Sequence, residues 1–276
     1  MSFIGKGRQA LDLIIDKGSL VEDEMAIGPG AITGIATIKG CTVTIIANDA
    51  KARNPRFPTV AAGVIGLEEA YKMAIAVYKA IKDGGADKEK RPIILIVDTP
   101  GNAPGKIDEI FGMNKATGAY QLALAEARQK GHPIVAMIVG RAISGAFLCH
   151  GLQADRIIAL SEKYNTMIHV MPLSSIARIT RMDIERLKEL SASNPVFASG
   201  ASYFHKLGGV EEIVEDAENM SEIIHRNITE IYQLNSDKHS DKLGPSGRGK
   251  LGAERGGRTV RPDIIDLMRR QFAELV

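Results

Sequence analysis

Two short, unbroken runs of apolar residues mark the middle of the chain, at residues 93–97 and 134–139. Each follows a proline, is rich in β-branched residues and is too short for a typical helix. Each therefore predicts a strand buried on both faces of a sheet. Apolar residues at helical spacing precede both runs, at residues 67–81 and 116–127. This alternation predicts an α/β protein whose functional loops lie at the carboxyl ends of parallel strands.

Weaker patterns predict the elements on either side of this centre. A helix is expected at residues 6–17, and Lys39-Gly40 separates two segments rich in β-branched residues that predict a hairpin over residues 31–47. Helical spacing returns at residues 220–234 and again at residues 263–275, which predicts a C-terminal helix.

The segment at residues 242–261 differs from the rest in composition. It holds six basic residues, one acid and six glycines, and we expect a basic, glycine-rich loop before the C-terminal helix. No internal repeat and no clean break in composition divides the chain. We therefore expect a single domain over residues 1–276.

The overall composition excludes several classes of protein. Of the 276 residues, 45% are hydrophobic and 25% are charged, as in ordinary globular proteins, and the net charge of +2 does not favour nucleic acid. No apolar run approaches the ~20 residues that span a bilayer. Cys41 and Cys149 lie far apart and make no disulfide framework. We expect a cytoplasmic protein with no nucleic-acid or membrane partner.

Candidate chemistry follows the two central strands. After the first comes Asp98-Thr-Pro-Gly-Asn-Ala-Pro-Gly105, in which Pro100 lacks a backbone donor and Gly101 permits positive φ. The second strand leads through Gly140-Arg-Ala-Ile-Ser144 to Gly145-Ala146. There a helix can begin with its first backbone N–H groups unpaired, which suits an anion or an oxygen that becomes one.

If the two strands are neighbours, an N–H near Gly101 or Asn102 and the N–H groups of Gly145 and Ala146 can converge on one oxygen. One such donor stabilises a transition state by about 2.7–4 kcal/mol. The structural alternative is that the small residues only let a helix pack closely on the sheet. Ser144 is expected to be a helix N-cap; as a nucleophile it lacks a His or Lys at a recognisable distance.

Three motifs, in the same order, resemble the acyl-CoA carboxyltransferases. Asp98-Thr-Pro-Gly-Asn-Ala-Pro-Gly, followed by Glu109 and Gly112, is similar to their D-x-P-G-F-x-P-G…E…G stretch. Ile143-Ser-Gly-Ala-Phe147 resembles their Gly-Gly-Ala-Tyr turn, and residues 62–72 resemble their Gly-Val-Leu…Lys segment. The likeness spans roughly residues 8–175. Within this group the sequences around Asp98 and Gly140 are most similar to those of the gamma subunits of biotin-independent malonate decarboxylases.

The resemblance implies a crotonase-like (ClpP/crotonase) fold, a carboxyltransferase-type spiral of ββα units with two sheets near perpendicular. It also implies partners: a homologous beta subunit that completes the site, an acyl carrier protein subunit and an acyl carrier protein transferase subunit. The implied reaction is decarboxylation of malonyl thioester, held on the CoA-like prosthetic arm of the carrier, to acetyl thioester and carbon dioxide.

The resemblance also assigns site residues. Gly145, Ala146, Gly101 and Asn102 are expected to be catalytic. The residues expected to bind substrate are Ser144, Arg141, Gly140 and Pro100. We expect no metal and no covalently bound cofactor. We also expect no biotin, because Ser144 and Asn102 stand where the carboxyltransferases have glycine and phenylalanine. Gly145 and Ala146 would then hold the departing carboxylate or a nearby water.

Two alternative functions remain at this point, and so does the question of whether two basic clusters bind phosphate. The chain could be half of a biotin-dependent carboxyltransferase, or a non-catalytic scaffold that recruits the carrier protein. Basic residues could hold the phosphates of a CoA-like arm, although such clusters are more often simply solvated. The two clusters are Lys51, Arg53 and Arg56, and Arg248, Lys250, Arg255 and Arg258.

Overall fold

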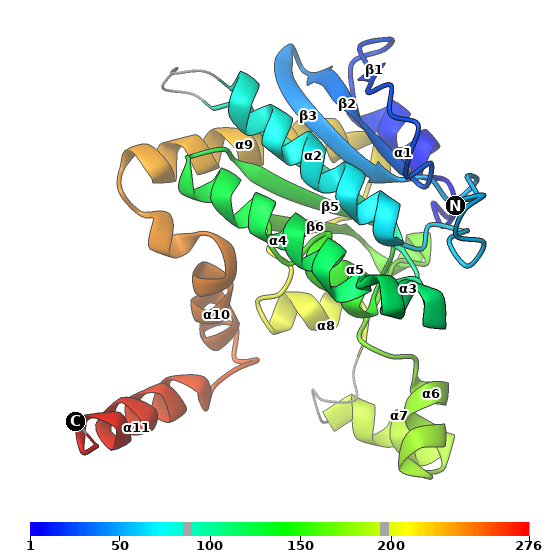
Figure 1. The fold of residues 1–276 in the computed structure, drawn as a ribbon. Coiled ribbons are helices and arrows are strands. Elements are labelled where there is room, and N and C mark those ends of the chain that lie inside the picture. The colour runs from blue at the N-terminus through cyan, green and yellow to red at the C-terminus, as the bar shows by residue number, and fades with distance from the viewer. Residues whose placement is uncertain (85–89, 194–198, 276) are drawn as a thin grey trace.

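One branched, mostly parallel sheet of eight strands forms the centre of the computed structural model (Figure 1), which describes residues 1–84, 90–193 and 199–275. The strand order is β1-β2-β3-β4-β5-β6-β8, and β7 pairs separately with β5. The strands are β1 (Val21–Glu22), β2 (Ala31–Ile38), β3 (Cys41–Asn48), β4 (Ile93–Thr99), β5 (Ile134–Ile143), β6 (Arg156–Leu160), β7 (Met167–His169) and β8 (Glu212–Val214).

Helices cover both faces of this sheet, which explains the unbroken apolar runs. In β4, Ile93 and Leu95 pack toward one face, whereas Ile94 and Ile96 pack toward the other, because side chains alternate along a strand. The first face is covered by α2 (Leu67–Asp83), α4 (Met113–Gln129), α5 (Ser144–Cys149) and α8 (Ala201–Lys206). The second face is covered by α1 (Gly7–Ile14) and α9 (Met220–Ser236).

The remaining helices are α3 (Lys106–Phe111), α6 (Leu173–Thr180), α7 (Ile184–Ser193), α10 (Gly244–Glu254) and α11 (Arg261–Ala273). Two of these parts stand away from the sheet, namely the α6-α7 pair and α11 (Figure 1). Neither α6 nor α11 has a buried residue. None of the helices in the described part of the chain is long and apolar enough to cross a membrane.

The alternation of strands and helices in the centre is confirmed, and so is the hairpin of β2 and β3. Its turn residues, Lys39 and Gly40, both have positive φ (49° and 77°), as a tight two-residue hairpin turn requires. The expectation of two near-perpendicular sheets is corrected to one branched sheet. The first part of β5 pairs with β6 and its last three residues pair with β7, so a single long strand serves both neighbours.

The terminal elements also differ from their predicted bounds. The N-terminal helix is shorter than the expected 6–17 because Ile15 already has extended backbone angles. The expected basic loop at 242–261 is wrong, since most of it forms α10. Its glycines serve close packing. A Cβ on Gly252 would lie 2.2 Å from the Leu207 oxygen, and one on Gly208 would lie 2.3 Å from the Arg248 oxygen. The C-terminal helix begins and ends two residues earlier than predicted.

A buried arginine fastens α10 to the sheet. Arg248 donates hydrogen bonds to the backbone oxygens of Ala154 (2.7 Å) and Leu152 (2.6 Å). Two buried carboxylates lie nearby and accept from strand N–H groups: Asp155 from Ile134 (2.9 Å), and Glu211 from Ile157 (2.6 Å). Burial raises the pKa of Asp155 to about 6 and that of Glu211 to about 7, against the opposing effect of the arginines.

We predict that Glu211→Gln costs less stability at pH 8 than at pH 5. The pKa of Glu211 in the folded protein lies above its ordinary value of 4.5. Its contribution to the free energy of unfolding is therefore greatest at low pH and is lost as the pH rises through about 7. Glutamine does not titrate and lacks this loss. Thermal unfolding should show that the difference in Tm between wild type and variant is smaller at pH 8 than at pH 5 by at least about 2 °C. Glu215→Gln, at an exposed carboxylate, controls for the amide exchange; a gap that widens toward pH 8 contradicts the prediction.

Candidate active site

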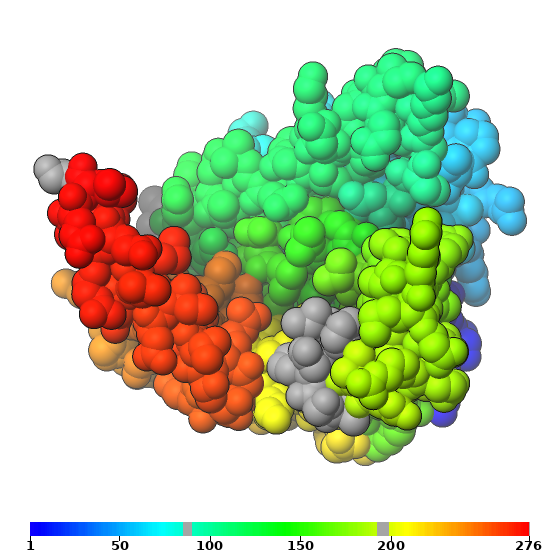
Figure 2. Space-filling view, turned by 90° about the horizontal axis from the view of Figure 1, so that it is seen from below, coloured from blue at the N-terminus to red at the C-terminus, as the bar shows by residue number. Residues whose placement is uncertain are grey.

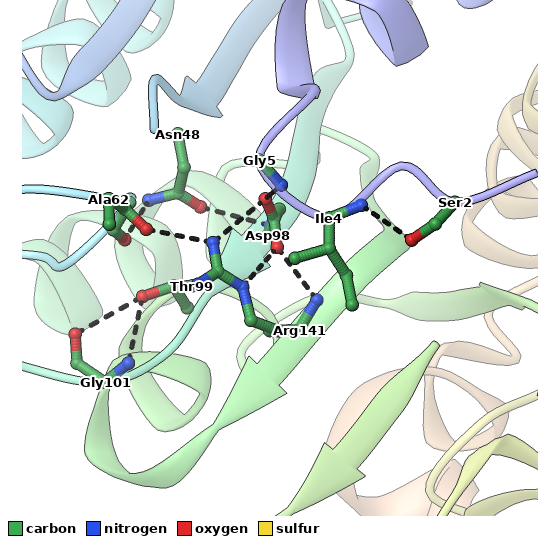
Figure 3. Close-up of polar contacts among 10 residues, drawn as sticks. Ser2, Ile4, Gly5, Asn48, Ala62, Asp98, Thr99, Gly101 and Arg141 are labelled. Carbon is green, nitrogen blue, oxygen red and sulfur yellow. Dashed lines mark hydrogen bonds and ion pairs between the residues drawn. The ribbon is translucent and has the colours of Figure 1, made fainter. Parts of the chain in front are cut away.

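A buried ion pair between β4 and β5 holds the candidate site together (Figure 3). The Asp98 carboxylate accepts hydrogen bonds from Arg141 Nε (2.8 Å), Arg141 Nη2 (3.2 Å) and the Arg141 backbone N–H (2.9 Å). It also accepts from the Gly5 N–H at 2.7 Å. The two side chains are only 2% and 14% exposed, so this pair lies largely out of water. One carboxylate thereby joins the N-terminal segment to the ends of two central strands.

The pair also reaches the loops around it. Arg141 Nη2 donates to the Ala62 oxygen (2.9 Å), and the Asp98 N–H donates to Asn48 Oδ1 at the end of β3 (3.3 Å). Neighbouring glycines leave the necessary room. A Cβ on Gly140 would lie 2.6 Å from Asp98 Oδ1, and one on Gly63 would lie 2.7 Å from the Asp98 backbone oxygen.

These contacts change the roles predicted for two residues. Arg141 was expected to bind substrate, but its guanidinium is directed at Asp98 and Ala62. Gly140 was expected to do the same, but it provides the space for the Asp98 carboxylate. Both residues therefore position the two loops, and their contact with substrate stays a prediction. Asp98 and Asn48 were not expected to belong to this network, although each is a polar residue at the end of an apolar strand.

Hydrogen bonds within the loop after β4 fix its shape. Thr99 Oγ1 both accepts from the Gly101 N–H and donates to the Gly101 oxygen, each at 3.3 Å. The Gly101 oxygen also accepts from the Ile65 N–H (3.1 Å), and the Ala103 N–H donates to the Ile65 oxygen (2.9 Å). The Gly101 N–H therefore has an internal acceptor, which corrects the expectation that it points to a reacting oxygen. Gly101 has φ +144° and is here a shaping residue.

The turn after β5 is sharper than the sequence suggested. β5 ends at Ile143, which is the N-cap of α5, and Ser144 follows in the left-handed region with φ +58°. A non-glycine residue there is strained by the order of 1–3 kcal/mol. The Ser144 side chain makes no capping hydrogen bond and is exposed, so the N-cap prediction is wrong. The turn brings the start of α5 against the loop at Gly101 and Asn102.

The two loops meet, as parallel pairing of β4 and β5 requires. A Cβ on Gly145 would lie 3.0 Å from Asn102 Nδ2, and one on Gly101 would lie 3.9 Å from the Ser144 Cβ. Asn102 Oδ1 is buried without a hydrogen-bond partner among the described residues. A buried polar atom without a partner is costly, and it is common where a ligand supplies the missing group. Ser144, Gly145 and Asn102 thus form one small polar site.

A buried histidine anchors the far end of α5 to the sheet. His150 Nδ1 lies 2.9 Å from the Tyr120 hydroxyl, and Nε2 lies 3.1 Å from the Ile96 oxygen. Burial lowers the pKa of His150 to about 4, so a neutral ring donates to Ile96 and accepts from Tyr120. Both ring nitrogens are therefore occupied. Within the described part of the chain, no hydrogen bond joins Ser144 to a base, which argues against a serine nucleophile.

The basic clusters considered as phosphate ligands are mostly engaged elsewhere. Arg56 pairs with Glu68 at 2.5 Å, while Lys51 and Arg53 are exposed. Arg248 donates to the backbone oxygens on which α10 packs, and Arg255 donates to those of His205, Val210 and Glu211. Among the described residues no group of three or more His, Cys, Asp and Glu side chains could hold a metal ion.

The fold and the two-loop site define a carboxyltransferase-type α/β domain. A family model described as the malonate decarboxylase gamma subunit matches residues 61–272, and the chain belongs to this family. The chain is 58% identical, over 98% of its length and 96% of the relative's, to the malonyl-S-ACP:biotin-protein carboxyltransferase MADD of Malonomonas rubra. It is 32% identical, over 66% of its length and 56% of the relative's, to the acetyl-coenzyme A carboxylase carboxyl transferase subunit alpha of Treponema denticola.

Solved structures give the same assignment. A chain of a Pseudomonas malonate decarboxylase hetero-tetramer in complex with coenzyme A matches with a TM-score of 0.74 and 30% identity, over 98% of this chain and 100% of that one. A chain of the MdcD-MdcE hetero-dimer of the Pseudomonas enzyme matches with a TM-score of 0.73 and 28% identity, over 91% and 93%. The family predicted from the three motifs is confirmed.

We predict that Asp98→Asn destabilises the chain by about 3 kcal/mol, because it leaves the mostly buried Arg141 without a counter-charge. Urea unfolding of the isolated chain measures this. Asp266→Asn is the matched control, since Asp266 pairs with Arg269 on the exposed surface of α11 and should change stability little. Equal midpoints for the two variants would show that the buried pair does not hold the strands together.

Proposed function

We propose that this chain is the gamma-type subunit of a complex that breaks the bond between the carboxylate and the α-carbon of malonyl thioester on an acyl carrier protein. The observation that carries the proposal is the meeting of Gly145 with Asn102 at the end of two parallel strands. A homologous beta subunit would complete the site. Membership of the gamma-subunit family and the likeness to chains of hetero-oligomeric decarboxylases support this arrangement.

The chemistry requires a place for developing negative charge. As the bond breaks, its electron pair moves onto the α-carbon and the thioester oxygen, and the carboxyl group departs without that pair. The first N–H groups of α5, at Gly145 and Ala146, are suited to an oxygen of the carboxyl group or its acceptor, because they lack partners within the helix. Pro100 and Ser144 would lie against the substrate. The enolate oxygen would be held by the partner subunit.

We infer further that the carboxyl group passes to biotin on a biotin protein. A cyclic urea presents an oxygen that accepts hydrogen bonds beside an N–H that donates, and the site offers helix N–H donors beside the unpartnered Asn102 Oδ1. The relative at 58% identity is named for transfer to a biotin protein. Bound biotin would supply a nitrogen that accepts the carboxyl group, while its proton would go to the α-carbon to give acetyl thioester.

Direct decarboxylation is the second candidate. The expectation of a site without biotin rested on Ser144 and Asn102, and the Pseudomonas relatives, at 28% and 30% identity, are malonate decarboxylases. In that case the carboxyl group leaves as carbon dioxide, and a proton from water or an acid completes the acetyl thioester. Both candidates use the same bond cleavage and differ only in what receives the carboxyl group.

We predict that the assembled complex requires a biotin protein to turn over malonyl thioester. Acetyl thioester formation should fall to background when the biotin protein is omitted or when avidin blocks it, because the carboxyl group then has no acceptor. Avidin saturated with free biotin serves as the control. Turnover at the same rate without the biotin protein and in the presence of avidin would establish direct decarboxylation instead.

We predict that Gly145→Val lowers kcat/KM of the complex by about 100-fold or more, the typical result of losing one oxyanion donor. Even the Cβ would lie 3.0 Å from Asn102 Nδ2, and the rest of the valine side chain would crowd the space beside the α5 N–H groups. Gly118→Val is the matched control, because Gly118 is an exposed helix residue with no atom within 4 Å of its Cβ position. Intact assembly with less than tenfold loss for Gly145→Val would favour a scaffold that only recruits the carrier protein.

A further inference from the structure

A further hollow lies at the other end of α5 from the Ser144 turn. It is a cleft of about 450 Å³ between α4, α5, α8 and the C-terminal helices. Figure 2 shows this side of the molecule, with α10 and α11 on one side of the α5 region and α6-α7 on the other. The residues that line the cleft and bear on its chemistry are Gln121, Leu148, Gln153, Arg248, Arg258 and Arg261.

Two of its arginines carry positive charge that no neighbouring acid neutralises. Arg258 anchors itself by one hydrogen bond from Nε to the Leu207 oxygen (2.8 Å), which leaves its terminal nitrogens available. Arg261 lies over Gly249, where a Cβ would come within 2.6 Å of its guanidinium carbon. Neither arginine forms an ion pair within residues 1–84, 90–193 and 199–275, the part that the structure describes.

The other basic groups nearby are not equivalent. Arg248 is buried and donates to two backbone oxygens, so it holds the wall of the cleft in place. Lys250 points away to Asp241, with which it pairs at 2.5 Å. Arg258 and Arg261 also line an adjoining hollow of about 470 Å³. Two guanidinium groups thus line both hollows, and the first hollow also holds the amides of Gln121 and Gln153. A guanidinium group binds phosphate through paired, charge-assisted hydrogen bonds.

The cleft is connected to the candidate active site through one short helix. Leu148, which is half exposed, lines the cleft and lies four residues after Ser144 on α5. Four residues of helix advance by about 6 Å. A pantetheine chain is longer than this step, so an arm that enters the cleft beside Leu148 is long enough to extend past it toward the Ser144–Ala146 turn.

We propose that this cleft binds the phosphate of the carrier protein's phosphopantetheine arm, with Arg258 and Arg261 as its ligands. The inference rests on the proposed function in one respect, namely that the substrate is carried on such an arm. Free coenzyme A presents phosphate of the same kind, but the proposal commits to the carrier-bound arm. Substrates that differ only in the phosphate test the site directly.

The first experiment compares malonyl-phosphopantetheine with malonyl-pantetheine on the assembled complex. Arg258→Ala and Arg261→Ala should each raise KM for malonyl-phosphopantetheine by about tenfold, which is the effect of losing one charge-assisted contact. Each variant should leave kcat/KM for malonyl-pantetheine within about twofold of the wild-type value. KM for the malonyl carrier protein should rise in parallel; a rise for malonyl-coenzyme A alone would assign the cleft to the free cofactor and overturn the proposal. Arg269→Ala, an exposed arginine of α11 outside both hollows, is the control.

The second experiment does not depend on turnover. Calorimetry should show that 4′-phosphopantetheine binds the complex at least about tenfold more tightly than pantetheine, and that the double variant Arg258→Ala/Arg261→Ala removes this preference. The proposal is overturned if the double variant loses the same affinity for both ligands, or loses affinity for neither. If wild-type complex binds 4′-phosphopantetheine selectively but cleaves no malonyl thioester, the proposed function fails and the phosphate site stands.

Discussion

The Asp98–Arg141 ion pair is the interaction on which the site depends. It joins β4, β5, the N-terminal segment at Gly5 and the loop at Ala62, four parts of the chain that lie far apart in sequence. Both side chains are largely removed from water, so loss of either partner would leave an unpaired buried charge. The glycine at position 140 is a consequence of this pair, because any larger residue would occupy the space of the carboxylate.

With these strand ends fixed, the position of the Ser144 turn follows. Parallel pairing of β4 and β5 puts their carboxyl ends side by side, and the left-handed Ser144 turns the chain at once into α5. The strain at Ser144 is offset by anchors elsewhere on the helix, namely buried Phe147 and the hydrogen bonds of His150 to two other elements. The helix is short, yet it is held at both ends. That rigidity keeps Gly145 against Asn102, as a preorganised site requires.

The same few residues bear on the proposed acceptor of the carboxyl group. Asn102 and Ser144 make the turn more polar than the glycine and phenylalanine of the acyl-CoA carboxyltransferases. By itself this favoured a site without biotin. The structure shows a buried amide oxygen without a partner beside helix donors, which suits a ureido group equally well. A substrate arm anchored at Arg258 and Arg261 would approach this turn along α5, and the acceptor would then approach from the side of the loop after β4.

Local sequence alone determined the two central strands, the central helices, the hairpin and the family, because apolar runs, helical spacing and the motifs at Asp98 and Ser144 are properties of neighbouring residues. Tertiary structure decided the rest. Arg141 proved to be a positioning residue and the Gly101 N–H proved to be satisfied, because their partners, Asp98 and Thr99, are identified only when the loops are folded. The glycines near residue 250 predicted a loop, yet they allow α10 to pack against Leu207, a contact between segments that are distant in sequence.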